Sequence, residues 1–448
     1  MKKFIESLIN VWKIEELKNR ILITLGILLV YRFGAQVTLP GIDATQLTGL
    51  AGQTKEGIGS ILDMFTGGAF SKASVFALGI MPYISASIVV QLMGIAIPYL
   101  QKLQNDGESG RKKINQITRW LTIGITLVQG PGYIYNLYRT LPSGAFLLGF
   151  NSFEFLFSSV VILVTGTIFA MWLGEKITDK GIGNGISLLI MVGILARFPQ
   201  AFIQEFAARV TNNNGGPMLL VIEIIIWLLV IISCILLVMA IRKIPVQYAR
   251  RTTTGDFEKD MMDGNRQWIP LKLNASGVMP IIFAQAIMFI PAAVAGLSKS
   301  EASQSIVGAF SNMFGFWYNL VFATLIVVFT FFYTAITVPT NKMSDDLKRS
   351  GGFIPGVRPG VETSDFLDRV MSLITFPGAL FLALLAVFPA IVVSLMDVQQ
   401  SWAMFFGGTS LIIMVGVAID TIQQINSYLL NKHYDGLMKS GKNRKAVA

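Results

Sequence analysis

Few residues in this chain could carry out covalent chemistry. The sequence holds one histidine, His433, and one cysteine, Cys234, and it contains no HExxH, GxSxG or Walker A pattern. A protease needs a base beside a nucleophile or a set of metal ligands, and an ATPase needs a phosphate-binding loop. The sequence therefore predicts a protein that is not an enzyme, with no metal site and no cofactor. Any process that it drives must take its energy from a partner or from the membrane potential.

Charged residues inside the apolar segments are equally few. Arg32 is the main one, whereas Glu154, Glu175, Glu223 and Asp420 lie near the ends of such segments. Ion-coupled transporters usually carry acidic or histidine side chains deep in the membrane. A secondary transporter is the first alternative function, because it also uses inverted repeats and broken helices, and an intramembrane enzyme is the second. The sequence shows neither an ion relay nor a catalytic group.

Long apolar runs dominate the composition of the 448-residue chain. Hydrophobic residues make up 53% of it and charged residues 14%, whereas a typical soluble domain has roughly 25% charged residues. A helix that crosses a bilayer needs about 20 mostly apolar residues. The runs predict ten such helices, at 21–38, 74–97, 118–138, 153–174, 184–207, 218–241, 273–297, 315–338, 370–393 and 403–425.

The basic residues are distributed unequally between alternate connections. Of the 36 Lys and Arg residues, 29 fall in one set of connections, which includes both termini, and six fall in the other. Because cytoplasmic loops collect Lys and Arg, we expect both termini to lie in the cytoplasm. The same bias accounts for the formal net charge of +10.

A polar, turn-rich stretch at 208–217 separates two sets of five predicted helices. An odd number of helices in each half requires the second half to enter the membrane inverted, as in many transporters and channels. The expected order is a cytoplasmic amphipathic N-terminal segment at 1–20, an N-terminal half at 21–207, an external hinge linker at 208–217, a C-terminal half at 218–425 with cytoplasmic loops at 242–272 and 340–369, and a cytoplasmic tail at 426–448.

Residues 57–97 form one apolar stretch that is too long for a single span. Residues 58–66 would make about two helical turns, which are too short to cross a bilayer of about 30 Å. Non-helical backbone survives at membrane depth only where protein or a water-filled cavity surrounds it. We therefore expect a short re-entrant helix at 58–70 that ends at Gly67–Gly68, with the next helix starting near Ala73. A helix on the external surface fits the same residues.

Six blocks of sequence resemble the SecY family of protein-conducting channels. They occur in the family's order over most of the chain, so they are specific jointly although each is weak alone. The loops at 139–152 and 298–312 match nothing recognisable, and the stretch at 338–351 differs from the family's usual run at the end of its eighth helix. The blocks are MFTGGAFSKASVFALGIMPYISASIVVQL (64–92), NDGESGRKKINQITR (105–119), GTIFAMWLGEKITDKGIGNGISLLI (166–190), PLKLNASGVMPIIFA (270–284), GGFIPGVRPG (351–360) and FFGGTSLIIMV (405–415).

The resemblance implies an all-α polytopic membrane protein with ten transmembrane helices in two inverted five-helix halves and a short re-entrant plug helix. Its pore would be closed at mid-membrane by a ring of branched apolar side chains, which excludes ions by dewetting. The i, i+4 spacing within two pairs of these residues places each pair on one helical face. The implied ring is Ile80, Ile84, Ile186, Ile190, Ile282 and Ile413, and the implied plug residues are Ile61, Leu62, Met64, Phe65, Gly67 and Gly68.

The resemblance also implies a lateral gate and a docking surface. Membrane segments would leave sideways between the second and seventh helices, along the polar residues Ser85, Ser87, Gln91, Gln129 and Gln285. The basic loops, with Arg250, Arg251 and Arg358, would bind the SecA motor ATPase and the ribosome, including its rRNA. The other implied partners are the small membrane subunits SecE and SecG, preproteins with signal sequences and the lipid bilayer. The implied function is the central pore of protein translocation in the bacterial cytoplasmic (inner) membrane.

Overall fold

The computed structural model describes residues 12, 14–47, 63–146, 152–211, 216–248, 267–285, 287–288 and 312–445. They belong to two compact units. The first unit comprises Met1–Gly216, Val398–Trp402 and Ile413–Ala448, and the second comprises Pro217–Asp397 and Ala403–Ile412. Each unit is described by itself below.

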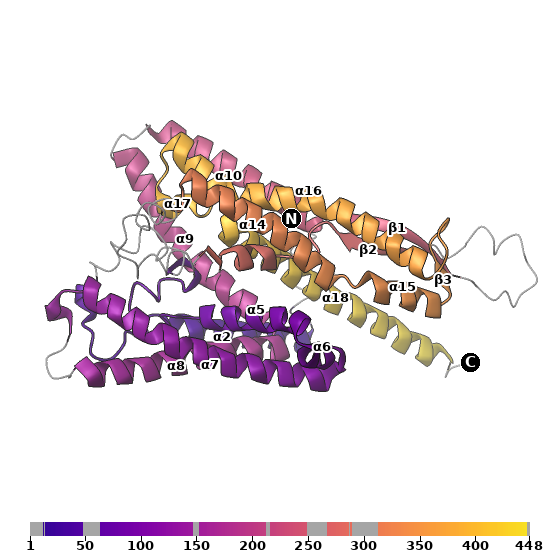
Figure 1. Ribbon diagram of the computed structural model, residues 1–448, viewed down its shortest axis with the longest axis horizontal. Coiled ribbons are helices and arrows are strands. Elements are labelled where there is room, and N and C mark those ends of the chain that lie inside the picture. Colours follow the sequence, from indigo (N-terminus) through magenta and orange to yellow (C-terminus); the bar gives the residue numbers. More distant parts are fainter. Residues whose placement is uncertain are drawn as a thin grey trace, which may run out of the picture. The chain divides into compact units, whose positions relative to one another are not determined.

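The first unit is a bundle of helices (Figure 1, indigo to magenta, with α18 in yellow). Helix α7 packs against α5 and α8, and α8 also packs against α2 and α9. Two short 3-10 turns, η1 (Ala44–Gln46) and η2 (Ser143–Ala145), lie in its connections. The helices are α2 (Glu15–Gly34), α5 (Met81–Ala96), α6 (Pro98–Asn105), α7 (Gly107–Thr140), α8 (Ser152–Lys180), α9 (Gly185–Thr211) and most of α18 (Gly408–Lys445).

Backbone contacts fix α8 against the segment that precedes α5. A Cβ added at Gly166 would lie 2.2 Å from the carbonyl oxygen of Val75. The Val75 N–H is held in turn, because it donates to the carbonyl of Val37 at 2.9 Å. The neighbour at Gly166 is therefore a fixed backbone atom and not the flexible end of a side chain.

We expect Gly166→Ala to destabilise the first unit by about 1–3 kcal/mol, the usual cost of overpacking, although alanine is the better helix former. The midpoint of thermal unfolding of the detergent-solubilised protein measures this. The matched control is Gly132→Ala on α7, where an added Cβ meets nothing within 4 Å. Equal midpoints for the two variants would contradict the close contact.

The second unit combines helices with a small sheet. Helix α14 packs along α16, and α15 packs against α16 and β3. A further short helix covers 279–285, after turns at 273–278. The named elements are α10 (Gly216–Met239), β1 (Ile241–Tyr248), β2 (Gln267–Lys272), α14 (Phe316–Thr337), α15 (Thr340–Arg349), β3 (Gly352–Phe353) and α16 (Val361–Met396). The four-residue α17 (Gln400–Ala403) comes next in sequence, and its first three residues belong to the first unit.

The sheet joins the two long basic loops, which the sequence analysis had not predicted to form strands. Its order is β2-β1-β3, with both pairings antiparallel, and Ile244 lies opposite Ile269. Alternate residues Ile244 and Val246 are buried and pack with Leu271, Leu347 on α15 and residues of α16. This alternation is the period-two signal of a half-buried strand, and the sequence carried it.

Six helices of the described residues are long and apolar enough to cross a membrane, and the sharply bent pair α5–α6 would be a seventh. Ile97 is extended between these two helices, and Pro98 starts the second one. The chain is thus a multi-pass membrane protein. The six lie in Phe153–Lys180, Gly185–Val210, Gly216–Met239, Phe316–Arg349, Val361–Met396 and Gln400–Leu430.

Several helices begin or end away from their expected positions. The helix expected at 74–97 starts only at Met81, because positive φ angles at Ala73 (44°) and Gly79 (54°) keep the backbone in turns. The helix expected at 403–425 starts at Gly408 and continues to Lys445. The expected plug helix at 58–70 is helical only at 63–65 among its described residues, and 66–70 form turns.

Candidate functional site

The segment 63–73 is compact and buried, and it consists mostly of turns. Gly67 and Gly68 have φ angles of 65° and 90°, a region that favours glycine. The Asp63 side chain holds the two ends of these turns together, because its Oδ1 accepts a hydrogen bond from the Ser71 N–H at 2.8 Å. The Thr66 hydroxyl accepts another from the Phe70 N–H at 3.2 Å. These local bonds satisfy backbone groups that a helix would have satisfied.

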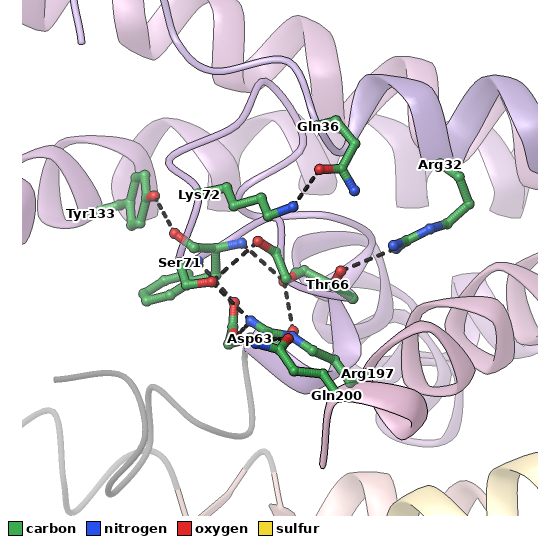
Figure 2. Close-up of polar contacts among 12 residues, drawn as sticks. Arg32, Gln36, Asp63, Thr66, Ser71, Lys72, Tyr133, Arg197 and Gln200 are labelled. Atoms are coloured by element: carbon green, nitrogen blue, oxygen red, sulfur yellow. Dashed lines mark hydrogen bonds and ion pairs between the residues drawn. The ribbon is translucent and has the colours of Figure 1, made fainter. Parts of the chain in front are cut away.

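Arg197 on α9 makes the main ionic contact with this segment. Its guanidinium forms an ion pair with the Asp63 carboxylate, and its Nη2 donates to the Ser71 hydroxyl at 2.8 Å. Figure 2 shows the guanidinium between these side chains and Gln200, whose Oε1 lies 3.4 Å from Nη1. The side chains of Arg197 and Asp63 are 27% and 10% exposed. Low exposure makes the loss of one partner costly, because the other charge is then left uncompensated in a poorly solvated site.

Two other helices bind the carbonyl groups of the same segment (Figure 2). Arg32 on α2 donates from Nη1 to the Gly67 carbonyl at 3.1 Å, and Tyr133 on α7 donates its hydroxyl to the Phe70 carbonyl at 2.8 Å. Lys72 also forms a hydrogen bond with Gln36, which follows α2. We call Arg32, Tyr133 and Arg197 the clasp, because they hold the segment from three helices.

The segment crosses α9 at very short range. A Cβ added at Gly193 would lie 2.6 Å from the Phe65 carbonyl oxygen, and one added at Gly67 would lie 2.8 Å from the Gly193 Cα. Only two facing glycines allow backbones to approach this closely. The clasp and this crossing together fix residues 63–73 against α9 without a covalent bond.

The six expected ring isoleucines lie on four elements. Ile80 precedes α5, Ile84 lies on it, Ile186 and Ile190 lie on α9, and Ile413 lies on α18, all in the first unit. Ile282 lies on the 279–285 helix of the second unit. Ile80, Ile190 and Ile413 are buried, and the other three are half-buried. Their convergence on one axis stays a prediction.

Two of the expected gate residues, Gln91 and Ser87, contact each other directly. Gln91 donates from its side-chain amide to the Ser87 hydroxyl at 3.3 Å within α5. Ser85 is half-buried, Gln129 on α7 is exposed, and Gln285 is buried in the second unit. The geometry of the gate itself stays a prediction.

The structure describes only some of the remaining expected site residues. Met64, Phe65, Gly67 and Gly68 belong to the clasped segment, whereas Ile61 and Leu62 lie outside the described residues. Arg358 is exposed beside α16 and pairs with Glu362 at 3.8 Å. Arg250 and Arg251 lie outside the described residues. In the part of the chain that the structure describes, no group of three or more His, Cys, Asp or Glu side chains is arranged to hold a metal ion.

Sequence reasoning missed most of the clasp. Arg32 was noted as a charge inside a span, but Asp63, Ser71, Tyr133 and Arg197 were assigned no role. The available signal was a basic residue in each of two apolar helices and one acid in the apolar stretch before Gly67. A charge at membrane depth indicates a partner or a functional site, so the sequence indicated that these charges need partners but not which residues pair.

Comparisons with known proteins agree with one another. The family model described as SecY matches residues 74–422. The "Protein translocase subunit SecY" of Thermotoga maritima is 39% identical over 440 residues, which cover 97% of this chain and 98% of that protein.

Solved structures share the fold at lower sequence identity. The structure reported as "The plug domain of the SecY protein stablizes the closed state of the translocation channel and maintains a membrane seal" is 18% identical, with a TM-score of 0.60 and 92% of each chain covered. "Sec61 in the Canine ribosome-channel complex from the endoplasmic reticulum" is 16% identical, with a TM-score of 0.51 and 92% of each chain covered.

Proposed function

The chain belongs to the SecY family of protein translocase subunits, and on that premise we propose that residues 63–73 are part of its plug and that the clasp holds this plug in the closed channel. The protein is the pore-forming subunit of a protein translocation channel. It passes unfolded preproteins across the membrane and releases membrane segments sideways. The proposed plug and the clasp go beyond this family function and are argued from the contacts of this chain.

One observation carries the assignment of the plug. Residues 66–73 are non-helical, and they lie among the helices α2, α7 and α9, whose side chains satisfy their polar groups. Irregular backbone is tolerated within a membrane only in such surroundings. The holding contacts are hydrogen bonds, one ion pair and the apolar packing of Phe70 against Tyr133. None of them is covalent, so the segment can leave and return.

The collar proposed behind the plug consists of Ile80, Ile84, Ile186, Ile190, Ile282 and Ile413. Stiff β-branched side chains suit a collar, because they have few rotamers. A narrow apolar constriction excludes ions by dewetting yet closes around a passing chain. The burial of Ile80, Ile190 and Ile413 supports positions inside the protein and not toward lipid.

The proposed lateral gate uses weak polar contacts, of which the Gln91–Ser87 hydrogen bond is an example. Such bonds contribute only about 1 kcal/mol in membranes, which suits a seam that must open. Signal sequences would enter lipid there.

The proposed docking surface includes the sheet and its basic loops. Arg242 and Lys243 are exposed on β1, and Arg358 is exposed beside α16. Phosphate attraction gives a sequence-tolerant affinity for rRNA. The similar Sec61 structure is a ribosome–channel complex, which supports the ribosome as a partner. We extend the proposal to the SecA motor and to the SecE and SecG subunits.

The proposed orientation places both termini and the basic loops in the cytoplasm of a bacterial cell, with the chain in the inner membrane. The excess of Lys and Arg in those connections supports it. The two inverted halves at 21–207 and 218–425 and the hinge linker at 208–217 belong to the same proposal. The protein needs no catalytic group of its own, since a motor, a ribosome or the membrane potential drives transport.

A cross-linking experiment tests the pore. A cysteine replaces Ile84 or Ile190 in the reconstituted complex, and a preprotein with a single cysteine is stalled inside. We expect a disulfide to the preprotein at both positions. Leu380→Cys on α16 is the matched control, because Leu380 is exposed on an apolar helix, and it should not cross-link. Equal yields at Ile190 and Leu380 would contradict the assigned path.

A further inference from the structure

The tight loop between α8 and α9, residues 181–184, is held by side chains from both ends of the chain. The Ile182 N–H donates to the Thr24 hydroxyl on α2 at 3.1 Å, and the Gly183 N–H donates to Oε1 of Gln424 on α18 at 2.8 Å. Arg20 donates to the Gly181 carbonyl at 3.4 Å. Three successive residues of the loop are therefore bound by two helices that are distant in sequence. All of these residues belong to the first unit.

The loop cannot relax easily from this position. Gly183 has a φ of 81°, and a Cβ added at Gly181 would lie 2.4 Å from the Thr24 Oγ1. A Cβ added at Gly185 would lie 1.9 Å from the carbonyl oxygen of Gly174 on α8. The glycines bring the loop into contact with its holders, so each hydrogen bond transmits displacement directly.

Apolar packing reinforces the same junction. Leu17 on α2 and Ile182 in the loop are buried together, and Ile425, Tyr428 and Leu429 of α18 pack against them. The Arg20 guanidinium carbon lies 5.3 Å from the centroid of the Tyr428 ring, within the range of a cation–π contact. Helix α18 is thereby attached to α2 and to the loop on one face.

The loop leads directly into the helix that carries two collar isoleucines. Asn184 caps α9, because its Oδ1 accepts hydrogen bonds from the N–H groups of Ile186 at 3.2 Å and Ser187 at 3.3 Å. Ile186 is the second residue of α9, and Ile190 follows one turn later. A shift or rotation of the loop therefore moves both side chains, since a helix start sets the position of its first turns.

We propose that Thr24 and Gln424 are positioning residues for the pore collar. They fix the start of α9 from α2 and α18, and they keep Ile186 and Ile190 in register around a passing chain. This inference rests on the proposed collar function of those isoleucines. Helix α18 carries Ile413 as well, so its movement would act on two parts of the collar together.

The test is Gln424→Ala in the complete complex with a stalled preprotein. The stalled preprotein displaces the plug, so the collar alone seals the pore. We expect ion leak around the stalled chain in a planar bilayer to rise about fivefold, the factor that loss of one neutral hydrogen bond gives. Resting conductance without preprotein should stay unchanged, because the clasp does not involve Gln424. Gln424→Glu retains the acceptor oxygen and should restore the seal.

The matched control is Gln423→Ala, which removes the neighbouring exposed glutamine and leaves both holders of the loop, Thr24 and Gln424, in place. Thr24→Val provides a second variant, which removes the other acceptor at nearly constant volume, and it carries the test if Gln424→Ala fails to assemble. Ile190→Gly separates the two proposals. If Ile190→Gly leaks but neither junction variant does, the junction is refuted and the collar stands. If Ile190→Gly also fails to leak, the collar itself is wrong.

Discussion

Reversing the charge of Arg197 with Arg197→Asp is expected to raise the ion conductance of the resting channel by roughly thirtyfold. The variant removes the partner of the Asp63 carboxylate and places a second negative charge beside it. Breaking a fully buried ion pair costs about 3–5 kcal/mol, and the partial exposure of Arg197 reduces this to about 2 kcal/mol. Because about 1.4 kcal/mol is a factor of ten, the open population should rise accordingly in planar-bilayer recordings.

Two further variants decide whether the charge pair is the cause. Combining Arg197→Asp with Asp63→Arg restores opposite charges and should recover part of the closure, although the hydrogen bond from the Ser71 N–H to Asp63 is lost. Arg139→Asp reverses an exposed charge at the end of α7 and should leave conductance unchanged. The clasp would be refuted by a closed Arg197→Asp channel, or by equal leaks from the Arg139 and Arg197 variants.

The second large effect is expected from Gly193→Val, which forces the plug away from α9 without any change in charge. An added Cβ would lie 2.6 Å from the Phe65 carbonyl oxygen, and the branched methyl groups increase the overlap. Overpacking of this kind costs about 1–3 kcal/mol, so we expect roughly a tenfold rise in resting conductance. Maleimide labelling of a Phe65→Cys residue should accelerate in parallel.

Gly26→Val on α2 is the control for this substitution, because an added Cβ there meets nothing within 4 Å. It introduces the same β-branched residue into a membrane helix of the same unit. Its conductance and labelling rate should match those of the unmodified channel. A Gly193→Val channel that stays closed, with Phe65→Cys still protected, would mean that the plug adjusts around α9 and is not seated by this crossing.

The sequence predicted best those helices that are apolar throughout. The run at 218–241 became α10 (Gly216–Met239), and the run at 315–338 became α14 (Phe316–Thr337). Their hydrophobicity changes abruptly at both ends, so the span and the boundary coincide. No tertiary contact was needed to locate them.

The start of α5 could not be predicted from the same signal. Residues 74–80 are as apolar as a helix, yet the Val75 N–H donates to the Val37 carbonyl, and the Leu39 N–H donates to the Ala73 carbonyl. The chain after α2 thus pairs with the chain before α5, with Thr38 bridged to Ser74. Partners more than thirty residues away decide this backbone, and periodicity carries no information about them.

The candidate site shows the same division. A length argument and a family resemblance indicated the segment that we propose as the plug, because an apolar stretch of that length cannot be one span. Its holding contacts were invisible, since Asp63 and Arg197 are far apart in sequence and meet only through the packing of α9. The convergence of the ring and the gate depends on contacts of the same kind and stays a prediction.

The strand β1 connects the two long basic loops through one sheet. It follows α10 directly and pairs with β2 along six residues. It also pairs with β3, which precedes α16 in sequence. The carbonyl of Ala240, the residue before β1, accepts a further hydrogen bond from the Leu273 N–H at 2.9 Å. Separate tethers would bend independently under load. Strands that are hydrogen-bonded in one sheet resist sliding past each other. A force applied to either basic loop is therefore transmitted to both α10 and α16.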